Sequence, residues 1–451
     1  MSEFFGSVWW LIVALGVLVT FHEYGHYWVA RRCGVKVLRF SVGFGTPLWR
    51  RLGKNGTEFV VAALPLGGYV KMLDEREGEV EPSELSQAFT QKTVFQRFAI
   101  VAAGPLFNLI LTLALLWAMF LIGKGDYSPT LGRTSGVAEQ AGLVIDDRIA
   151  RIDGKEIPTW THLNIELTAA VMDRRALALE VTSADGAQRQ VTLPLDTIDA
   201  GLEERQAMRQ VGLMPRQWML PPTVGELVPD GAAAAAGLRT GDRLISVNGT
   251  PIDFFDQIAA ALNQGSEPGE MVTLVVERDG GRLDFQLRPK AETLENGETV
   301  WRIGIAPARS AAKHDVVLSF GPIDAIGAAF RETADLGVAT LGMLKRMISG
   351  LASLNNLSGP ISIAQYANAS AQSGVAGFLF FLAVLSLSLC IMNLLPIPIL
   401  DGGHLLYYLI EMIKGSPVSE RVLVAGQYVG LVFLAGLMGL AFYNDIVRLV
   451  S

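Results

Sequence analysis

The stretch LVTFHEYGHYWVA (Leu18–Ala30) is decisive for the fold, because it places His22, Glu23 and His26 in an otherwise apolar run. The two histidines are four residues apart, so they project from one face of a helix about a turn apart. This H-E-x-x-H spacing is typical of two imidazoles that bind one metal ion. An ionisable side chain inside a membrane helix costs roughly 2.5–3.5 kcal/mol, so three within five residues require a partner. A zinc ion is one such partner, and hydrogen bonds across a helix bundle are the alternative.

The composition indicates a membrane protein that also has large parts outside the membrane. Half of the 451 residues are hydrophobic and 18% are charged, with long polar stretches between the apolar ones. The formal net charge of -7 argues against nucleic acid as a partner. Four apolar runs are long enough to span a bilayer core, which takes about 20 helical residues. These runs are Ser7–Ala30, Phe98–Ile122, Val375–Leu395 and Val422–Phe442.

The distribution of basic residues sets the expected orientation of these spans. Lys and Arg crowd residues 31–97, whereas residues 1–8 carry only Glu3 as a charged side chain. The positive-inside rule then places both termini and the segment 123–374 outside, and the segments 31–97 and 411–421 in the cytoplasm. We expect the first span to be retained, because it lacks the basic start and small-residue cleavage site of a signal peptide. Cys33 and Cys390 lie in or beside spans, so no disulfide framework is expected.

A catalytic zinc ion usually has three protein ligands, so a third ligand is expected elsewhere in the chain. The first and third spans point the same way, and the histidines lie in the cytoplasmic third of the first. At the matching depth the third span reads MNLLPIPILDGGHLL (Met392–Leu406), where Asp401 is the only acidic residue. Asp401 is therefore the predicted ligand. Glu411 lies further towards the loop, and His404 is assigned a supporting role.

The residues around Asp401 predict a break in the third span. Pro396 and Pro398 cannot continue a regular helix, and the double glycine after Asp401 permits backbone conformations that other residues avoid. Non-helical backbone at membrane depth is tolerated only beside protein or a wet cavity, so this break is expected to line the site. Asn393 either contacts a substrate backbone there or hydrogen-bonds between helices. Glu23 is placed to take a proton from a zinc-activated water and pass it to a leaving amine, which is peptide hydrolysis.

Two β-rich segments follow the first span. VLRFSVGFG (Val37–Gly45) and TEFVVAALPLGGYVKML (Thr57–Leu73) are joined by a turn that contains Asn-Gly, a strong hairpin signal. A substrate segment in lipid is helical and must become extended before it is cut, so it needs replacement partners for its backbone hydrogen bonds. A free strand edge near the metal could supply them by strand addition. The alternative is a hairpin that only covers the ends of the helices.

The long external segment contains a duplication. Residues Gly136–Ile157 align with residues Gly231–Ile252 at a constant offset and without gaps. The pattern resembles PDZ domains, with Gly212 and Gly304 in the loops that receive a peptide carboxylate. The first copy has Asp146 where the second has Gly241, so the sequence does not settle the conformation of that turn in the first copy. The two modules either bind peptide C-termini or restrict access to the membrane site by their size. Residues Ile323–Leu351 predict an amphipathic helix on the outer membrane surface.

Four motifs together resemble the site-2 protease family of intramembrane zinc metalloproteases. They are HEYGH, AAGPLFN (Ala102–Asn108), NNLSGP (Asn355–Pro360) and NLLPIPILDGGH (Asn393–His404). The resemblance implies that His22, His26 and Asp401 bind Zn2+ and that Glu23 is the catalytic base. It also implies that Asn393 and the break at Pro396 and Pro398 hold substrate, and that Gly43, Phe44 and Gly45 lie near the site on a membrane-reentrant β-loop.

The predicted fold class is a polytopic α-helical membrane protein with four transmembrane helices, a membrane-associated β-hairpin region and two external PDZ domains. The predicted divisions are 1–35, 36–96 (the β-loop), 97–123, 124–221 and 222–310 (the PDZ domains), 311–373 (external amphipathic helices), 374–404 and 405–451. The resemblance implies a bacterial inner membrane protein with periplasmic termini and PDZ domains. Its substrate is expected to be a pre-trimmed single-pass protein such as an anti-sigma factor, or a remnant signal peptide. A non-catalytic PDZ adaptor is the alternative, and a transporter is disfavoured because no inverted repeat is visible.

Overall fold

The computed structural model of the chain describes residues 2–76, 78–198, 204–263, 270–293, 299–308, 313–354 and 357–450. The chain forms two units. The membrane unit comprises Met1–Gly125 and Val317–Ser451, and the inserted unit comprises Asp126–Val316.

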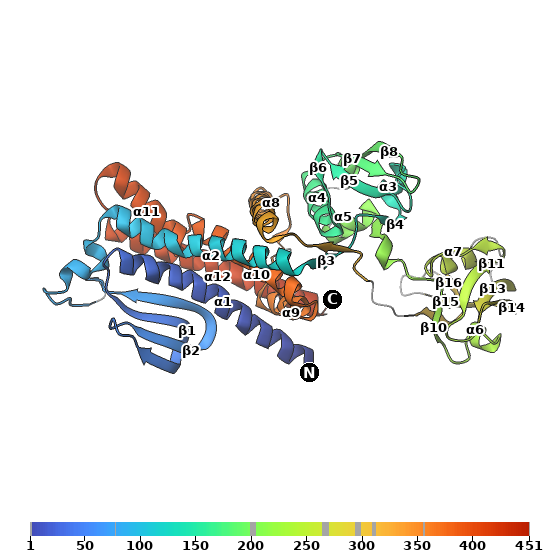
Figure 1. Cartoon of the computed structure of the whole chain (residues 1–451), viewed down its shortest axis with the longest axis horizontal. Helices are drawn as coiled ribbons and strands as arrows, with labels where there is room; N and C mark the ends of the chain where they lie inside the picture. Colours follow the sequence, from blue (N-terminus) through green and yellow to red (C-terminus); the bar gives the residue numbers. More distant parts are fainter. Residues whose placement is uncertain are drawn as a thin grey trace. The chain divides into compact units, whose positions relative to one another are not determined.

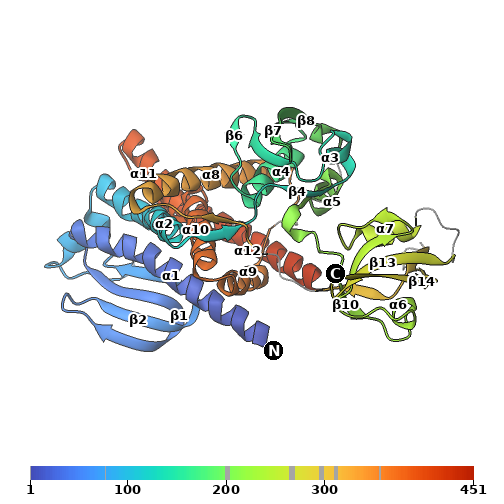
Figure 2. The same ribbon diagram turned by 45° about the vertical axis from the view of Figure 1, so that its right-hand side comes forward.

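Four helices of the membrane unit carry the apolar runs of the sequence. They are α1 (Ser2–Arg32), α2 (Val94–Ile122), α10 (Val375–Leu394) and α12 (Glu420–Val450). Each is long and apolar enough to cross a membrane, which confirms the prediction of four candidate spans. Helix α2 packs against both α1 and α10, and it runs alongside α1 in both views (Figure 1, Figure 2). A capping box formed by Thr93 and Gln96 starts α2, and Gly123, with φ 91°, ends it.

The break predicted near Asp401 is present in the structure. Helix α10 ends at Leu394, and a separate helix, α11 (Asp401–Lys414), begins at Asp401. Pro396 and Pro398 lie between them and interrupt the helix because they lack a backbone N–H. The predicted boundary at 404 is therefore corrected. Residues 405–414 belong to α11 and not to the fourth span, and the turn predicted at 411–421 shrinks to the residues between α11 and α12.

The remaining helices of the membrane unit come before and after the inserted unit in the sequence. Two short 3-10 turns, η1 (Leu85–Gln87) and η2 (Phe89–Gln91), precede α2, and α8 (Pro322–Ile348) and α9 (Pro360–Gln372) precede α10. Helix α8 is amphipathic as predicted, although it ends three residues earlier. Ile323, Phe330 and Ile348 are exposed, whereas the buried residues are Ala325, Ala328, Ala329, Thr333 and Leu336. An exposed apolar stripe of this kind suits a lipid surface.

The start of α9 is held by the last turns of α12. Asp445 is almost fully buried and accepts hydrogen bonds from the N–H groups of Gly359 (3.0 Å) and Ser362 (3.2 Å) and from the Ser362 hydroxyl (2.5 Å). This carboxylate therefore serves as an N-cap supplied by another helix. The NNLSGP stretch, which we expect to form a turn before the third span, is described only in part, because Asn355 and Asn356 lie outside the described residues.

The β-rich region forms a sheet from two strands that each bend back on themselves. Strands β1 (Val37–Leu52) and β2 (Glu58–Met72) are longer than the predicted segments. Phe40 is paired with both Phe59 and Val70, so the first half of β1 lies between the two halves of β2. The second half of β1 is paired only with residues 58–62. The sheet therefore has two edges, formed by residues 47–52 and 68–72, and it lies beside α1 (Figure 1).

The two copies in the inserted unit share one topology. Each has a four-stranded sheet, in the order β6-β5-β7-β8 or β12-β11-β13-β14, and a two-stranded pair, β4-β9 or β10-β17. The first copy contains β4 (Leu131–Thr134), α3 (Gly136–Gln140), β5 (Arg148–Ile152), β6 (Lys155–Glu156), α4 (Trp160–Asp173), β7 (Leu177–Thr182), β8 (Gln188–Leu193), η3 (Leu195–Thr197), α5 (Glu204–Val211) and β9 (Leu213–Pro215). The second contains β10 (Val224–Leu227), α6 (Ala232–Ala235), β11 (Arg243–Val247), β12 (Thr250–Pro251), α7 (Gln257–Asn263), β13 (Val272–Arg278), β14 (Gly281–Leu287), β15 (Lys290–Thr293), β16 (Thr299–Arg302) and β17 (Ile305–Pro307). Strands β3 (Lys124–Asp126) and β18 (Val316–Leu318) and the turn η4 (Arg216–Trp218) complete the elements.

The turn that differs in sequence between the copies has the same backbone conformation in both. Asp146 has φ 65° and Gly241 has φ 96°, and the N–H of each donates to the first strand of its own copy. Aspartate is one of the few non-glycine residues that tolerate this left-handed region. The substitution is therefore compatible with the shared fold.

A buried carboxylate follows this turn in each copy. Asp147 pairs with Arg189, and Asp242 accepts bonds of 2.6 and 2.7 Å from Arg278. The bonds from Arg278 lower the pKa of Asp242 against the opposing effect of its burial. An aspartate–arginine ion pair thus joins the turn to the sheet in both copies, with the arginine on β8 in the first copy and on β13 in the second.

Candidate metal centre

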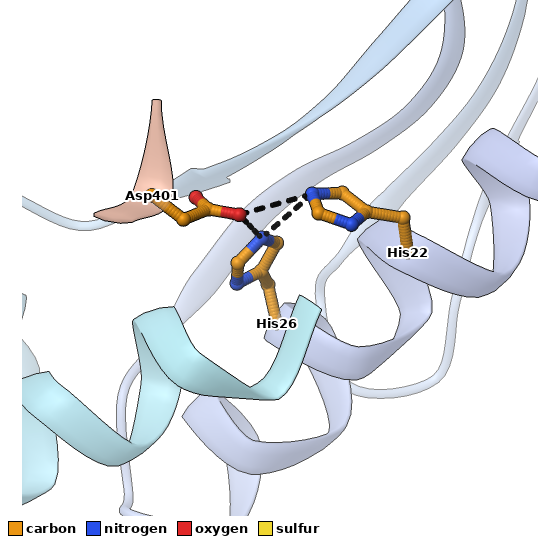
Figure 3. A group of neighbouring side chains, drawn as sticks. All are labelled: His22, His26 and Asp401. Atoms are coloured by element: carbon orange, nitrogen blue, oxygen red, sulfur yellow. Dashed lines mark hydrogen bonds and ion pairs between the residues drawn. The ribbon is translucent and has the colours of Figure 1, made fainter. Parts of the chain in front are cut away.

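His22 and His26 project from one face of α1 and meet Asp401 at the start of α11. The two Nε2 atoms are 3.3 Å apart. They lie 3.2 Å (His22) and 3.6 Å (His26) from Oδ2 of Asp401, as Figure 3 shows. Within the described residues, these three form the one cluster of His, Cys, Asp or Glu side chains that could hold a metal ion. The structure therefore brings together the ligand set expected from the sequence.

The distances in this cluster fit a tetrahedral zinc ion. Zinc binds imidazole nitrogen and carboxylate oxygen at about 2.0–2.2 Å, so neighbouring ligand atoms in a tetrahedron lie about 3.3 Å apart. The measured separations are 3.2, 3.3 and 3.6 Å. In addition, Oδ2 of Asp401 is buried and has no hydrogen-bond partner. A cation between the three atoms would bind that oxygen, because it would accept one lone pair from Oδ2 and one from each Nε2.

The proton on His26 can be assigned from its neighbour. Nδ1 lies 2.8 Å from the backbone carbonyl of Ile100 in α2, and a carbonyl can only accept. Nδ1 therefore carries the proton, and Nε2 offers its lone pair towards Asp401 and His22. A ligating histidine commonly has such a partner on its other nitrogen, which fixes the ring. Pro105, inside α2, lacks an N–H and so locally interrupts the helical hydrogen bonds next to this carbonyl.

Helix α2 approaches the imidazoles closely through a glycine. A Cβ built on Gly104 would lie 2.3 Å from Nε2 of His26 and 2.8 Å from Cε1 of His22. On α1, a Cβ on Gly25 would lie 2.4 Å from the carbonyl oxygen of Ala103. Both helices thus use glycine where they cross, and no larger residue fits. The AAGPLFN motif of the second span therefore lies directly against the two imidazoles.

Glu23 follows His22 on α1 and lies next to the sheet. A Cβ on Gly68 of β2 would be 3.0 Å from Cγ of Glu23 and 2.8 Å from Val19. The edge of the sheet formed by residues 68–72 therefore reaches the helix at the level of Glu23. Glu23 is not a member of the ligand cluster, which leaves its carboxylate available for proton transfer.

The predicted substrate residues on the third span lie in or beside the helix break. Asn393 is half-buried near the end of α10, and its side chain makes no hydrogen bond with any residue in the described part of the chain. The interhelical hydrogen bond considered as an alternative is therefore not seen. Pro396 is exposed, and Pro398 packs against α12, where a Cβ on Gly426 would lie 3.3 Å from it. A role of these three residues towards substrate stays a prediction.

Gly43, Phe44 and Gly45 form the bend of β1. Gly43 and Gly45 have φ 90° and 86°, and the exposed Phe44 ring stacks on Tyr69 at 6.2 Å. Only glycine adopts such angles freely, so the bend depends on the GFG sequence. Whether this bend contacts substrate also stays a prediction.

The two rival candidates on α11 have other partners. His404 packs edge-to-face against Tyr407, with 6.3 Å between ring centroids. Glu411 forms an ion pair of 2.7 Å with Arg97 at the start of α2. Neither joins the ligand cluster.

The sequence alone leaves the role of Asn108 open, and the structure gives it a position beside a ligand. Asn108 is fully buried in α2, and its side-chain nitrogen lies 3.3 Å from Nδ1 of His22. Its backbone carbonyl accepts bonds from Thr112 (2.9 Å) and from Ser386 of α10 (2.8 Å). The only signal in the sequence is an amide within an apolar span, which does not name its partner.

Comparison with known proteins agrees with this geometry. A model of peptidase family M50 matches residues 10–437. The chain is 50% identical over 452 residues to a Xylella fastidiosa (strain 9a5c) protein provisionally named as a zinc metalloprotease, covering 99% of this chain and 100% of that protein. It is 41% identical over 453 residues to the regulator of sigma-E protease RseP of Escherichia coli (strain K12), covering 100% of both. It is 41% identical to the protein of the same name from Salmonella typhimurium (strain 14028s / SGSC 2262), covering 97% and 98%.

Proposed function

Because the chain belongs to peptidase family M50 and is a zinc metalloprotease, we propose that it cleaves single-pass membrane proteins within the bilayer. One observation carries this proposal, namely that the ligand cluster is built from the apolar helix α1 and from the break after the apolar helix α10. A metal site at that depth serves a substrate that is itself in the membrane. The family assignment also answers the alternative of a non-catalytic adaptor.

His22, His26 and Asp401 would hold the zinc ion, which supplies a Lewis acid that activates water and polarises the scissile carbonyl. Glu23 takes the proton from the attacking water and delivers it to the leaving amine. The side chains of the two histidines are 14% and 11% exposed and that of Asp401 is 19% exposed, so the cluster excludes most solvent and remains accessible. Low exposure strengthens the electrostatic interactions that drive the reaction.

The substrate is proposed to lie as an extended strand along residues 68–72. A peptide must leave its helical form before it is cut, and the backbone groups of a free strand edge replace the lost hydrogen bonds. Residues 68–72 are paired on one side only, and Gly68 brings this edge to Glu23. Asn393, at the end of α10 beside the helix break, is proposed to bind the same backbone with its side-chain amide.

The substrate class is proposed from the names of the relatives. Proteins named regulator of sigma-E protease are 41% identical to this chain over nearly its full length. An anti-sigma factor that has already lost its external domain is the proposed substrate, and remnant signal peptides are a second group. The protein is proposed to lie in a bacterial inner membrane, with its termini and the inserted unit in the periplasm, as the basic residues of 31–97 indicate.

The two copies in the inserted unit are proposed to be PDZ domains. Their shared topology and the positive φ of Gly212 (77°) and Gly304 (79°) support this assignment. They are proposed to act as a size filter that keeps untrimmed proteins from the membrane site. Peptide C-termini are the ligands expected for their grooves.

The catalytic assignment is tested by Glu23→Gln in the purified full-length chain, with a tagged single-span protein as substrate. We expect cleavage to stop while about one zinc ion per chain is retained, because the amide cannot accept the proton but no ligand is lost. His22→Ala should lose both zinc and cleavage. Glu3→Gln, on the exposed first turn of the same helix, is the matched control. A Glu23→Gln enzyme with full activity would refute the role of Glu23.

The strand-edge assignment needs a different probe. Val42 is paired on both sides, with Gly68 and Val61, so proline there would damage the sheet and would not report on the edge alone. Cysteine cross-linking in the Glu23→Gln chain, with both native cysteines replaced, is sharper. Lys71→Cys on the edge beside α1 should form a disulfide with a cysteine in the substrate. Arg51→Cys on the opposite edge is the control, and equal cross-linking at both would count against this edge.

A further inference from the structure

Asn108 is a buried amide whose side-chain orientation conflicts with the chemistry of a zinc ligand. Its Nδ2 lies 3.3 Å from Nδ1 of His22, and its Oδ1 is buried without a hydrogen-bond partner. His22 presents Nε2 to Asp401 at 3.2 Å. When Nε2 gives its lone pair to a cation, the proton of the neutral ring must be on Nδ1. Two N–H donors would then face each other.

Rotation of the amide by half a turn removes this conflict. The oxygen and nitrogen of an asparagine side chain have nearly the same shape, so their assignment follows from the hydrogen-bond partners. In the rotated form Oδ1 takes the place 3.3 Å from Nδ1 and accepts its proton. Either orientation leaves one amide atom without a partner, but only the rotated one is complementary to a ligating His22.

The backbone around Asn108 holds the amide in place. Its carbonyl accepts from the hydroxyl of Ser386, so α10 fixes this turn of α2. Asn108, Thr112 and Ser386 are all fully buried. Ile100, two turns earlier on α2, already orients His26 through its carbonyl. The second helix thus contacts the outer nitrogen of both histidines, once with its backbone and once with a side chain.

We propose that Asn108 is a positioning residue, which accepts the Nδ1 proton of His22 and thereby fixes the tautomer and ring orientation that bind zinc. This inference rests on the proposed ligand set. A partner on the outer nitrogen of a ligating histidine typically contributes 10–100-fold to metal affinity. The acceptor, and not the amide as such, is the required chemical feature.

The test is the zinc affinity of the purified full-length chain, measured by competition with a chromophoric chelator and therefore independent of activity. Asn108→Ala and the space-filling Asn108→Leu should each bind zinc roughly 10–100-fold more weakly. Asn108→Asp, which keeps an acceptor of the same shape, should bind within about threefold of the parent or more tightly, because a carboxylate raises the basicity of the ring. The cobalt-substituted Asp variant should keep the absorption spectrum of the parent, whereas that of the Leu variant should change.

Asn444→Ala is the control, since Asn444 is a buried amide of α12 that donates to Leu354 and contacts no ligand. Its zinc affinity should equal that of the parent. Parental zinc affinity in a folded Asn108→Leu chain would overturn the inference, and so would an Asp variant that binds zinc as weakly as the Leu variant. His22→Ala separates this outcome from failure of the proposed function. If His22→Ala retains zinc, the ligand set itself is wrong.

Discussion

Replacing Gly104 by alanine should disrupt the metal centre by the addition of one methyl group. The new Cβ would lie 2.3 Å from Nε2 of His26, whereas real Cβ contacts almost never fall below 3.0 Å, so the ring must move by at least 0.7 Å. His22 must move too, because its Cε1 would be 2.8 Å away. Metal–ligand distances tolerate changes of only about 0.2 Å. The strain cannot be relieved by a simple swing of His26, since its Nδ1 is bonded to Ile100.

We expect Gly104→Ala to weaken zinc binding roughly 100-fold or more, the upper end of the effect of lost ligand support. This corresponds to about 2.8 kcal/mol of binding free energy. Chelator competition on the purified chain measures the affinity, and cleavage of a single-span substrate should fall with it. Gly16→Ala on α1 is the matched control, because a Cβ there meets nothing within 4 Å and zinc binding should not change. Zinc binding at parental strength by a folded Gly104→Ala chain would refute this close approach.

Three further predictions concern other parts of the chain. The hydrogen bonds from Arg278 lower the pKa of Asp242, so this ion pair stabilises the second copy at pH values above the ordinary aspartate pKa of 3.8. The stabilisation is lost as the pH falls through the lowered pKa. Arg278→Met should therefore shift the acid unfolding of the inserted unit to higher pH, which hydrogen exchange can follow. Deletion of Ser128 to Ala308 should let the enzyme cleave a substrate that keeps its external domain, and an unchanged need for trimming in a gel assay would argue against the filter. Asp445→Ala leaves the N–H groups at the start of α9 without their acceptor and should cost about 2–4 kcal/mol of stability in a denaturant titration, whereas an unaltered midpoint would show that the cap contributes little.

The four apolar helices and the clustering of His22, His26 and Asp401 could be predicted, because they follow from local patterns and from the depth of residues within the spans. A span needs only a run of apolar residues, and the H-E-x-x-H spacing fixes two side chains on one helical face. Asp401 could be found because few acidic residues lie at that depth. The prolines before it also indicated the break, although the exact start of α11 depends on packing that no local pattern encodes.

The partners of the histidines could not be predicted, because they depend on the register between two helices that are distant in the chain. Nothing in the sequence near Ile100 or Asn108 indicates that the backbone carbonyl of Ile100 contacts His26 or that the side chain of Asn108 contacts His22. The double bend of β1 and β2 was missed for a related reason. A hairpin signal specifies the turn between two strands, but it does not tell whether either strand folds over its partner.

The separation of the ligands along the sequence has a consequence for synthesis. His22 and His26 enter the membrane with the first helix, but Asp401 emerges from the ribosome only after the whole inserted unit has been made. Until then the nascent chain has only two of the three proposed ligands, which is too few for a catalytic zinc ion. If these three residues are the zinc ligands, the chain should be inert until α11 has been made, and a product that ends before α11 should not cleave its neighbours.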